Sequence, residues 1–153
     1  MTNLGVDYSY SQPRPALVAA NGYTFVCRYL SSKPGSGKVI TKTEAQQLDA
    51  AGLCIVLVFE LTADRTKAGF DAGTADATYA KQAAHDVGAP DGCLIYFAVD
   101  FDAAATDLPA IDDYFRGAQS VLGAQRVGGY GKASVGRRLL DNNRAAKWWQ
   151  SYA

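Results

Sequence analysis

Short apolar stretches alternate with segments of helical periodicity along the whole chain. Strands are expected at residues 4–10, 24–30, 54–61, 93–102, 126–131 and 148–153. Helices are expected between them at residues 13–20, 45–51, 74–87, 108–122 and 134–140. Strands that are apolar on both faces and alternate with helices indicate a parallel sheet covered by helices. The pattern therefore predicts an α/β fold, and both a doubly wound sheet and a TIM barrel fit it.

Local residues mark several of the boundaries between these elements. Thr41 and Glu44 have the spacing of a capping box at the start of a helix. Residues 31–38 are rich in Ser, Gly and Pro and are expected to form a loop. Gly88 follows the third expected helix and Pro90 comes soon after, which is typical of a helix end.

The fourth expected strand carries two aspartates at its carboxyl end. Side chains alternate between the two faces of a strand, so Tyr96, Ala98, Asp100 and Asp102 are expected to share one face. Both carboxylates should then point the same way.

The other strands also end in polar residues. These residues, one for each strand in chain order, are Asp7, Arg28, Glu60, Tyr130 and Gln150. Barrels and open α/β sheets build their sites at the carboxyl ends of the strands. We therefore expect a carboxylate-rich pocket centred on Asp7, Glu60, Asp100 and Asp102. Crowded carboxylates raise the pKa of one another, and Arg28 nearby would keep some ionised, so one site could hold both a proton donor and a charged base.

A structural role is the alternative for each of these residues. Asp7 could cap the loop that follows it. Glu60 could be paired with Arg28, since buried acids need partners. Asp100 and Asp102 could begin a turn. A functional cluster is the one reading that explains all of them together.

Composition narrows the class of protein. Apolar residues make up 48% of the 153 residues and charged residues 20%, with 15 acidic and 15 basic side chains, which predicts one globular domain over residues 1–153. Because acidic and basic residues balance, the chain has no excess of positive charge for binding nucleic acid. No apolar run is long enough to span a membrane. No secretory signal is recognisable, so we expect a cytoplasmic protein, another export route or a missing upstream segment.

Cysteine and histidine suggest no metal or cofactor chemistry. Cys27, Cys54 and Cys93 lie in apolar stretches without Cys-x-x-Cys spacing, and we expect buried, reduced thiols. His85 is the single histidine and has no second ligand near it in the sequence, so a zinc site is not expected.

Five short motifs together resemble a known family. They are Gly5-Val-Asp-Tyr-Ser, Cys27-Arg-Tyr, Phe59-Glu, Ile95-Tyr-Phe-Ala-Val-Asp-Phe-Asp and Gly129-Tyr-Gly. They resemble the glycoside-hydrolase-like domain catalogued as domain of unknown function 1906, which occurs in secreted actinobacterial proteins and in endolysins of their phages. That domain is similar to the family 25 lysozymes (muramidases), which cut peptidoglycan on a TIM-barrel-like fold. The resemblance covers essentially the whole chain and implies a TIM-barrel-like (β/α) fold.

The resemblance also assigns positions and shows two departures. Asp7 matches the first-strand Asp of the lysozymes and Asp100 the Asp of their fourth-strand motif, but Asp102 stands where they carry the catalytic Glu. A proton donor on this shorter side chain would sit about 1 Å further back. Six strands are expected where a closed barrel has eight, so the barrel is expected to be truncated, as a fragment or as a sheet that needs a partner.

Hydrolysis of peptidoglycan or a related β-linked amino-sugar polymer is the leading functional hypothesis. Asp102 or Glu60 would protonate the leaving oxygen, and Asp100 or Asp7 would stabilise charge or activate water. Flat surfaces for sugar rings are expected from Tyr29, Tyr96, Tyr130 and Trp148, although core packing is the alternative for these aromatics. Arg28 and Gln150 are the polar residues expected to contact the substrate, and other wall-binding modules are the expected fusion partners or associates.

Two other functions remain open from the sequence. A wall-binding module that lost efficient turnover would fit Asp102 and the missing strands. A phosphate binder is suggested by residues 35–38, Gly-Ser-Gly-Lys, but Ser32 and Val39 depart from the P-loop pattern, which favours an ordinary surface loop.

Overall fold

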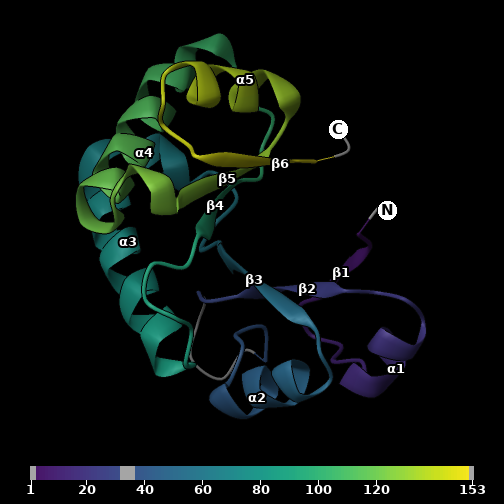
Figure 1. Cartoon of the computed structure of the whole chain (residues 1–153). Coiled ribbons are helices and arrows are strands. Elements are labelled where there is room, and N and C mark those ends of the chain that lie inside the picture. Colours follow the sequence, from purple (N-terminus) through teal and green to yellow (C-terminus); the bar gives the residue numbers. More distant parts are fainter. Residues whose placement is uncertain (1–2, 32–36, 152–153) are drawn as a thin grey trace.

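The computed structural model describes residues 3–31 and 37–151 and contains one curled parallel sheet. Its strands are β1 (Gly5–Asp7), β2 (Phe25–Tyr29), β3 (Cys54–Phe59), β4 (Ile95–Val99), β5 (Val127–Gly131) and β6 (Lys147–Gln150). They pair in sequence order, each parallel to the next. The sheet curls into a half-barrel with helices around its convex side (Figure 1). The barrel-like alternative is therefore confirmed over the doubly wound sheet.

Five α-helices and three short 3₁₀ helices connect these strands in the described residues. They are α1 (Pro15–Ala20), α2 (Lys42–Ala50), η1 (Arg65–Ala68), α3 (Gly69–Asp86), η2 (Ala105–Asp107), α4 (Leu108–Leu122), η3 (Ala124–Arg126) and α5 (Ala133–Asp141). Every expected helix and strand is present. The differences lie at the ends, and the most important is that β4 ends at Val99, because the Asp100 backbone N–H turns away to the carbonyl of Ala63 at 3.1 Å.

The two faces of the sheet have different environments. Leu57, Ile95 and Val127 lie in register on the convex face and pack in the main core under the helices. Phe97 continues this face and meets the rings of Tyr114 and Phe115 at centroid distances of 6.0 and 6.4 Å. The concave face carries the alternate residues, which are the ones left to form a site.

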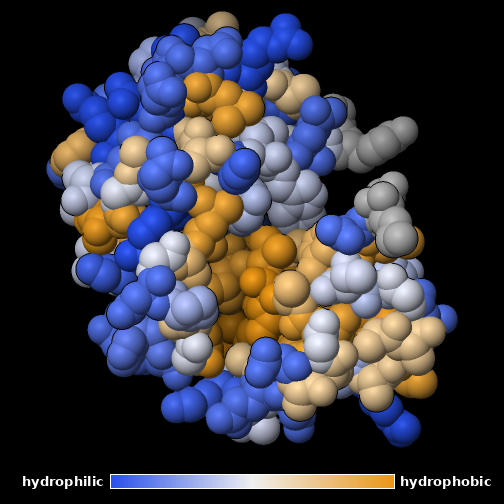
Figure 2. Space-filling model, viewed as in Figure 1, coloured by the Kyte–Doolittle hydropathy of each residue, from blue (hydrophilic) through white to orange (hydrophobic). Residues whose placement is uncertain are grey.

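The concave side is open. In the described residues no strand pairs with the outer edge of β1 or β6, and the sheet does not close. A separate apolar hollow lies beside β3, between α2 and the segment that follows α3 (Figure 2). Cys54, at the start of β3, is exposed and Cys93 is half-buried, so the expectation of three buried thiols is confirmed only for Cys27. For Cys54 the reason is that a half-barrel leaves part of the concave face uncovered.

Candidate functional site

Asp7, Tyr29 and Glu60 meet at the carboxyl ends of the first three strands. Tyr29 lies opposite Val58 in the β2–β3 register, so Tyr29, Val58 and Glu60, two residues further on, face the concave side. The Tyr29 hydroxyl donates a hydrogen bond to Asp7 Oδ2 at 3.1 Å. These contacts place the two carboxylates, as predicted from strand phase, around one tyrosine.

Lys38 also belongs to this group, although no pattern in the sequence predicts it there. Its Nζ donates to Glu60 Oε2 at 2.9 Å and lies 4.2 Å from the centre of the Tyr29 ring. The sequence placed Lys38 at the end of a surface loop over residues 31–38, of which 32–36 lie outside the described residues. Lys38 and Glu60 are 22 residues apart in the sequence, so only the fold shows that the two side chains meet.

Burial raises the pKa of Asp7 above its usual value, although much of the residue is solvent-exposed. The negative charge of Glu60 also raises this pKa, whereas the Tyr29 hydrogen bond and the charges of Lys38 and Arg28 lower it. Removal of the carboxyl group from water is the largest of these effects. Asp7 is thus the carboxyl group of this cluster that is biased toward holding a proton.

Tyr130 on β5 extends the group across the concave face. Burial raises the pKa of its hydroxyl, and the negative charges of Asp100, Asp7 and Glu60 add to this effect. Its ring packs against Trp149 with centroids 4.7 Å apart. Tyr130 and Trp149 pair in the β5–β6 register, whereas Trp148 faces the helices and packs against Phe115 at 6.5 Å. Trp149, which strand phase could have identified, therefore takes the position that the sequence analysis gave to Trp148.

Asp100 and Asp102 do not share the environment expected for them. They line a cavity of about 430 Å³ with Lys132 and Ser151. Asp102 forms an ion pair with Lys132, and its side chain is 90% exposed. The hydrogen bond from Lys132 holds the pKa of Asp102 below its usual value. Because β4 ends at Val99, alternation cannot fix the direction of Asp102, and the structure places it at the rim.

Arg28 lies apart from the carboxylates. Its side chain is fully buried, and its Nε and Nη2 donate to the two oxygens of Glu44 at 2.6 and 3.0 Å. Its Nη1 donates to the carbonyl of Tyr8 at 2.6 Å. The alternative pairing of Arg28 with Glu60 is therefore wrong: Glu60 pairs with Lys38. The structure does not bring Arg28 to a position where it could contact a bound sugar.

Tyr96 and Gln150 were also expected to contact substrate, and they differ in placement. Tyr96 faces the concave side in the middle of β4, where its ring fits against Gly128, a position at which a Cβ atom would lie 2.9 Å from that ring. Gln150 pairs with Gly131 in the register, and so lies on the opposite face from Tyr130. The structure thus brings Tyr96, but not Gln150, to the concave face.

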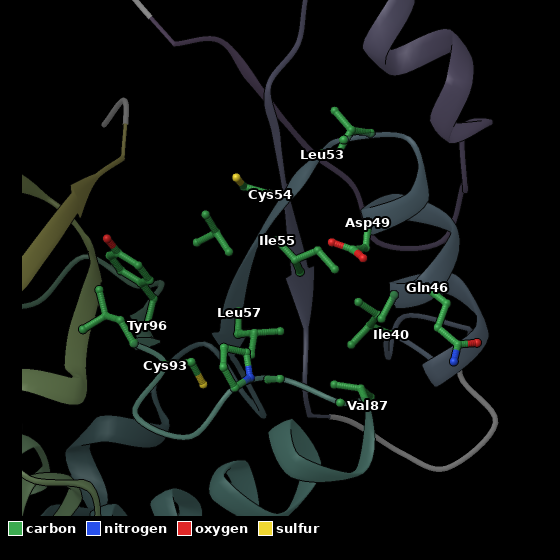
Figure 3. Close-up of a pocket in the computed structure, with 17 residues that line it drawn as sticks. Ile40, Gln46, Asp49, Leu53, Cys54, Ile55, Leu57, Val87, Cys93 and Tyr96 are labelled. Carbon is green, nitrogen blue, oxygen red and sulfur yellow. The ribbon is translucent and has the colours of Figure 1, made fainter.

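A larger cavity lies away from the carboxylates. It has a volume of about 740 Å³ and is lined around the amino ends of β3 and β4 by Leu53, Ile55, Leu57, Leu94 and Tyr96, with Asp49 and Gln46 from α2 (Figure 3). Barrel enzymes use the opposite, carboxyl end of the strands. We therefore place the candidate site at Asp7, Glu60 and Tyr130.

Residues 3–31 and 37–151 contain neither a membrane-spanning helix nor a cluster of metal ligands. No helix there is long and apolar enough to cross a bilayer. The same residues contain no group of three or more His, Cys, Asp or Glu side chains arranged to hold a metal ion.

Comparison with known proteins connects this geometry to a family. A family model described as "Rv2525c-like, glycoside hydrolase-like domain" matches residues 16–152. A Mycobacterium tuberculosis protein named "Putative peptidoglycan hydrolase Rv2525c" is 27% identical over 154 residues, covering 95% of this chain and 64% of the relative. A Bacillus subtilis protein named "Uncharacterized protein FadG" is 33% identical over 105 residues, covering 66% of this chain and 18% of the relative. The chain thus spans less than two thirds of the length of either curated relative.

Solved structures show the same similarity. The crystal structure of the Tat-secreted Mycobacterium tuberculosis protein Rv2525c in complex with HEPES has a TM-score of 0.89 at 26% identity, over 95% of this chain and 76% of that one. The modular autolysin LytC from Streptococcus pneumoniae has a TM-score of 0.62 at 14% identity, over 91% of this chain and 33% of that one. At this low identity, the second similarity concerns the fold alone.

Proposed function

Because the chain belongs to the Rv2525c-like, glycoside hydrolase-like domain family, we propose that it binds an amino-sugar polymer such as peptidoglycan and hydrolyses one of its glycosidic bonds. The relative named "Putative peptidoglycan hydrolase Rv2525c" supports the choice of polymer. Cleavage between two sugars, as muramidases perform it, is the form of the reaction that the carboxylates favour.

One observation carries this proposal: Asp7 and Glu60 lie around Tyr29 in different electrostatic environments. Asp7 has a raised pKa, and Glu60 contacts the ammonium group of Lys38. Glycoside hydrolysis needs one carboxyl group that donates a proton and one that is charged. The cluster offers both at the carboxyl ends of the strands.

The proposed roles follow from these environments. Protonated Asp7 gives its proton to the glycosidic oxygen as the bond to the anomeric carbon breaks. Glu60, as a carboxylate, stabilises the positive charge that develops on the sugar ring. Water adds its hydroxyl group to the anomeric carbon, and the proton that it loses returns to the Asp7 carboxylate. The rings of Tyr130 and Trp149 offer a flat surface for a neighbouring sugar. Asp102 fits the role of proton donor less well than Asp7, because its lowered pKa leaves it protonated less often and it lies at the rim.

A turnover assay on purified cell walls tests the proposal. The wild-type chain should release reducing sugar ends, and Asp7→Asn and Glu60→Gln should each lower the rate by about 10²-fold or more, the usual contribution of a general acid or base. Asp113→Asn is a matched control, because Asp113 is exposed on α4 and pairs only locally with Arg116 at 2.8 Å. It should keep the wild-type rate. If Asp102→Asn is as damaging as Glu60→Gln, the acid belongs at Asp102.

A wall-binding module of the same fold is the second candidate. The favouring observation is Asp102, which stands at the position of the catalytic Glu in similar lysozymes and is exposed and paired with Lys132. Such a module would co-sediment with purified walls and release no reducing ends. That pair of results would overturn the proposed hydrolysis and leave binding as the function.

A further inference from the structure

Lys38 is held at the carboxyl end of β2 by its own backbone neighbours. Val39 forms an isolated parallel bridge with Tyr29, and the Ile40 backbone N–H donates to the Tyr29 carbonyl at 2.9 Å. These contacts attach the segment before α2 to the end of the strand. The position of Lys38 over Tyr29 is therefore set by main-chain pairing and does not depend on its side chain alone.

The Lys38 side chain is largely enclosed. It is 17% exposed, its Nζ lies 2.9 Å from Glu60 Oε2, and the same atom lies over the face of the Tyr29 ring at 4.2 Å from the centroid. An enclosed ammonium group is costly unless it is paired, and a cation over an aromatic face is attracted by the ring. Both contacts therefore favour one fixed position of this group.

The two contacts of Lys38 connect it to the two carboxylates of the site, Glu60 and Asp7. The Glu60 backbone N–H donates to Ser31 Oγ at 2.8 Å, which fixes the main chain of Glu60 and leaves its carboxylate to be oriented by Lys38. The Tyr29 ring under Lys38 carries the hydroxyl that donates to Asp7. Lys38 thus contacts Glu60 directly and acts on Asp7 through the ring of Tyr29 and through its charge.

We propose that Lys38 is a positioning residue of the candidate site, which orients the Glu60 carboxylate and holds Tyr29 in place for its hydrogen bond to Asp7. Its effect on turnover rests on the proposed hydrolysis. Its effect on the ionisation of Asp7 does not, since that effect follows from the charges in the cluster alone.

The charged and titratable groups around Asp7 come from three directions. They are Cys27, Arg28 and Tyr29 on β2, Lys38 before α2 and Glu60 after β3. Tyr130 on β5 also lies within the electrostatic reach of Asp7. The positive charge of Lys38 lowers the pKa of Asp7 and so opposes burial and Glu60. Removing that charge should raise the pKa of Asp7 further above its usual value.

Carboxyl-carbon NMR titration of the whole chain tests this directly. Lys38→Met should move the Asp7 midpoint upward relative to wild type, and Lys38→Arg should leave it closer to wild type because the charge is kept. Lys42→Met is the matched control, since Lys42 is an exposed lysine at the start of α2. It should not move the midpoint. Lys38→Gln provides a second neutral variant if Lys38→Met does not fold.

Turnover on purified walls provides the second measurement. Lys38→Met should lower kcat about tenfold or more with a smaller change in KM and shift the pH profile upward, and Lys38→Arg should recover part of the rate. An Asp7 midpoint that is unchanged in both neutral variants overturns the inference, whatever the activity. If the Asp7 midpoint rises in the neutral variants while the wild-type protein cleaves nothing, the result supports the positioning role and overturns the proposed hydrolysis instead.

Discussion

At the scale of single residues, two aspartates near the same edge of the sheet have opposite electrostatics. Burial raises the pKa of Asp7, whereas Lys132 lowers that of the exposed Asp102. The folded state therefore binds a proton at Asp7 more tightly than the unfolded chain, and at Asp102 less tightly. Proton linkage converts this difference into opposite dependences of stability on pH.

Asp7→Asn should stabilise the protein at neutral pH. The folded-state pKa of Asp7 lies above the unfolded value of 3.8, so its contribution to stability is present below that value and is lost as the pH rises through the folded pKa. An asparagine cannot ionise and can still accept the Tyr29 hydrogen bond. Urea unfolding at pH 7 should give a higher free energy of unfolding for the variant, and at pH 3 the two proteins should be alike.

Asp102→Asn is the control for this prediction. Its lowered folded pKa contributes stability above pH 3.8 that is lost as the pH falls through the folded value. The variant should therefore gain nothing at pH 7. An Asp7→Asn protein that is less stable than wild type at pH 7 would show that Asp7 is a structural residue.

At the scale of elements, a buried ion pair fastens α2 to β2. Glu44 lies at the third position of α2, where its backbone N–H donates to Thr41 Oγ1 at 3.1 Å, as the capping-box spacing predicts. Its carboxylate accepts from Arg28 and from the Tyr8 hydroxyl at 3.0 Å instead of completing the box. Burial and this contact raise the pKa of Tyr8 to about 12. The Glu44 side chain therefore binds Arg28 on β2 instead of the backbone at the start of its own helix, as a complete capping box would require.

Glu44→Gln should destabilise the protein strongly. It leaves Arg28, which is fully buried, without a counter-charge, and breaking such a pair costs about 3–5 kcal/mol. Thr41→Ala, which removes only the helix cap, should cost about 1 kcal/mol. Guanidinium unfolding of both variants makes the comparison. If both variants lose the same free energy of unfolding, the ion pair contributes no more to stability than the cap of α2 does.

Helices α3 and α4 approach one another closely at two glycines. A Cβ atom on Gly73 would lie 1.9 Å from the carbonyl oxygen of Tyr114, and one on Gly117 would lie 2.1 Å from that of Phe70. Backbone lies against backbone at both points, so the neighbours cannot yield as a flexible side chain would. The close packing of these two helices needs the absence of a side chain.

Gly73→Ala should therefore lower stability by about 1–3 kcal/mol, the usual cost of overpacking. Helix propensity alone predicts a gain of about 0.5–1 kcal/mol, so the sign decides between the two effects. Thr78→Ala, at an exposed position of α3, is the control and should be close to neutral. Thermal unfolding of the two variants provides the measurement, and a stabilised Gly73→Ala protein would contradict the close approach.

At the scale of the whole molecule, the half-barrel leaves its concave face partly uncovered. Cys27 and Cys54 both belong to this face, because Cys27 pairs with Val56, two residues after Cys54. Cys27 is buried and Cys54 is exposed. Burial raises the pKa of the Cys27 thiol to about 12, so little reactive thiolate forms there at neutral pH. The open architecture therefore predicts a difference in reactivity between two thiols of one surface.

Thiol labelling at pH 8 followed by mass spectrometry should modify Cys54 at least about tenfold faster than Cys27, because thiolate content and exposure control the rate. Urea should make the two rates similar. Slow labelling of Cys54 in the folded protein would contradict an open concave face. If the labelling rate of Cys54 falls as the protein concentration rises, a second copy of the chain covers that face.

The sequence by itself determined the elements, their order and the faces of the strands. Alternation within β3 and β4 was enough to predict which of their side chains face the helices, because the side-chain period of a strand is fixed by covalent geometry. The expected parallel direction of the two strands placed Glu60 and Asp100, which directly follow them, at the same edge of the sheet. The motifs further indicated a barrel over a doubly wound sheet. That one domain spans residues 1–153 and that two strands are missing stay predictions.

Only the tertiary structure decided which charges meet. Arg28 was expected beside the acids, but its side chain lies on the helix-facing side of β2 and pairs with Glu44. Lys38 pairs with Glu60 from a loop, and hydrophobic periodicity does not predict where a loop runs. Asp102 was assigned a direction by continuing the alternation past Val99, where the strand ends and the rule no longer applies. Ion pairs depend on distances between segments far apart in the chain. A repeating local pattern fixes the side chain's face but not its partner.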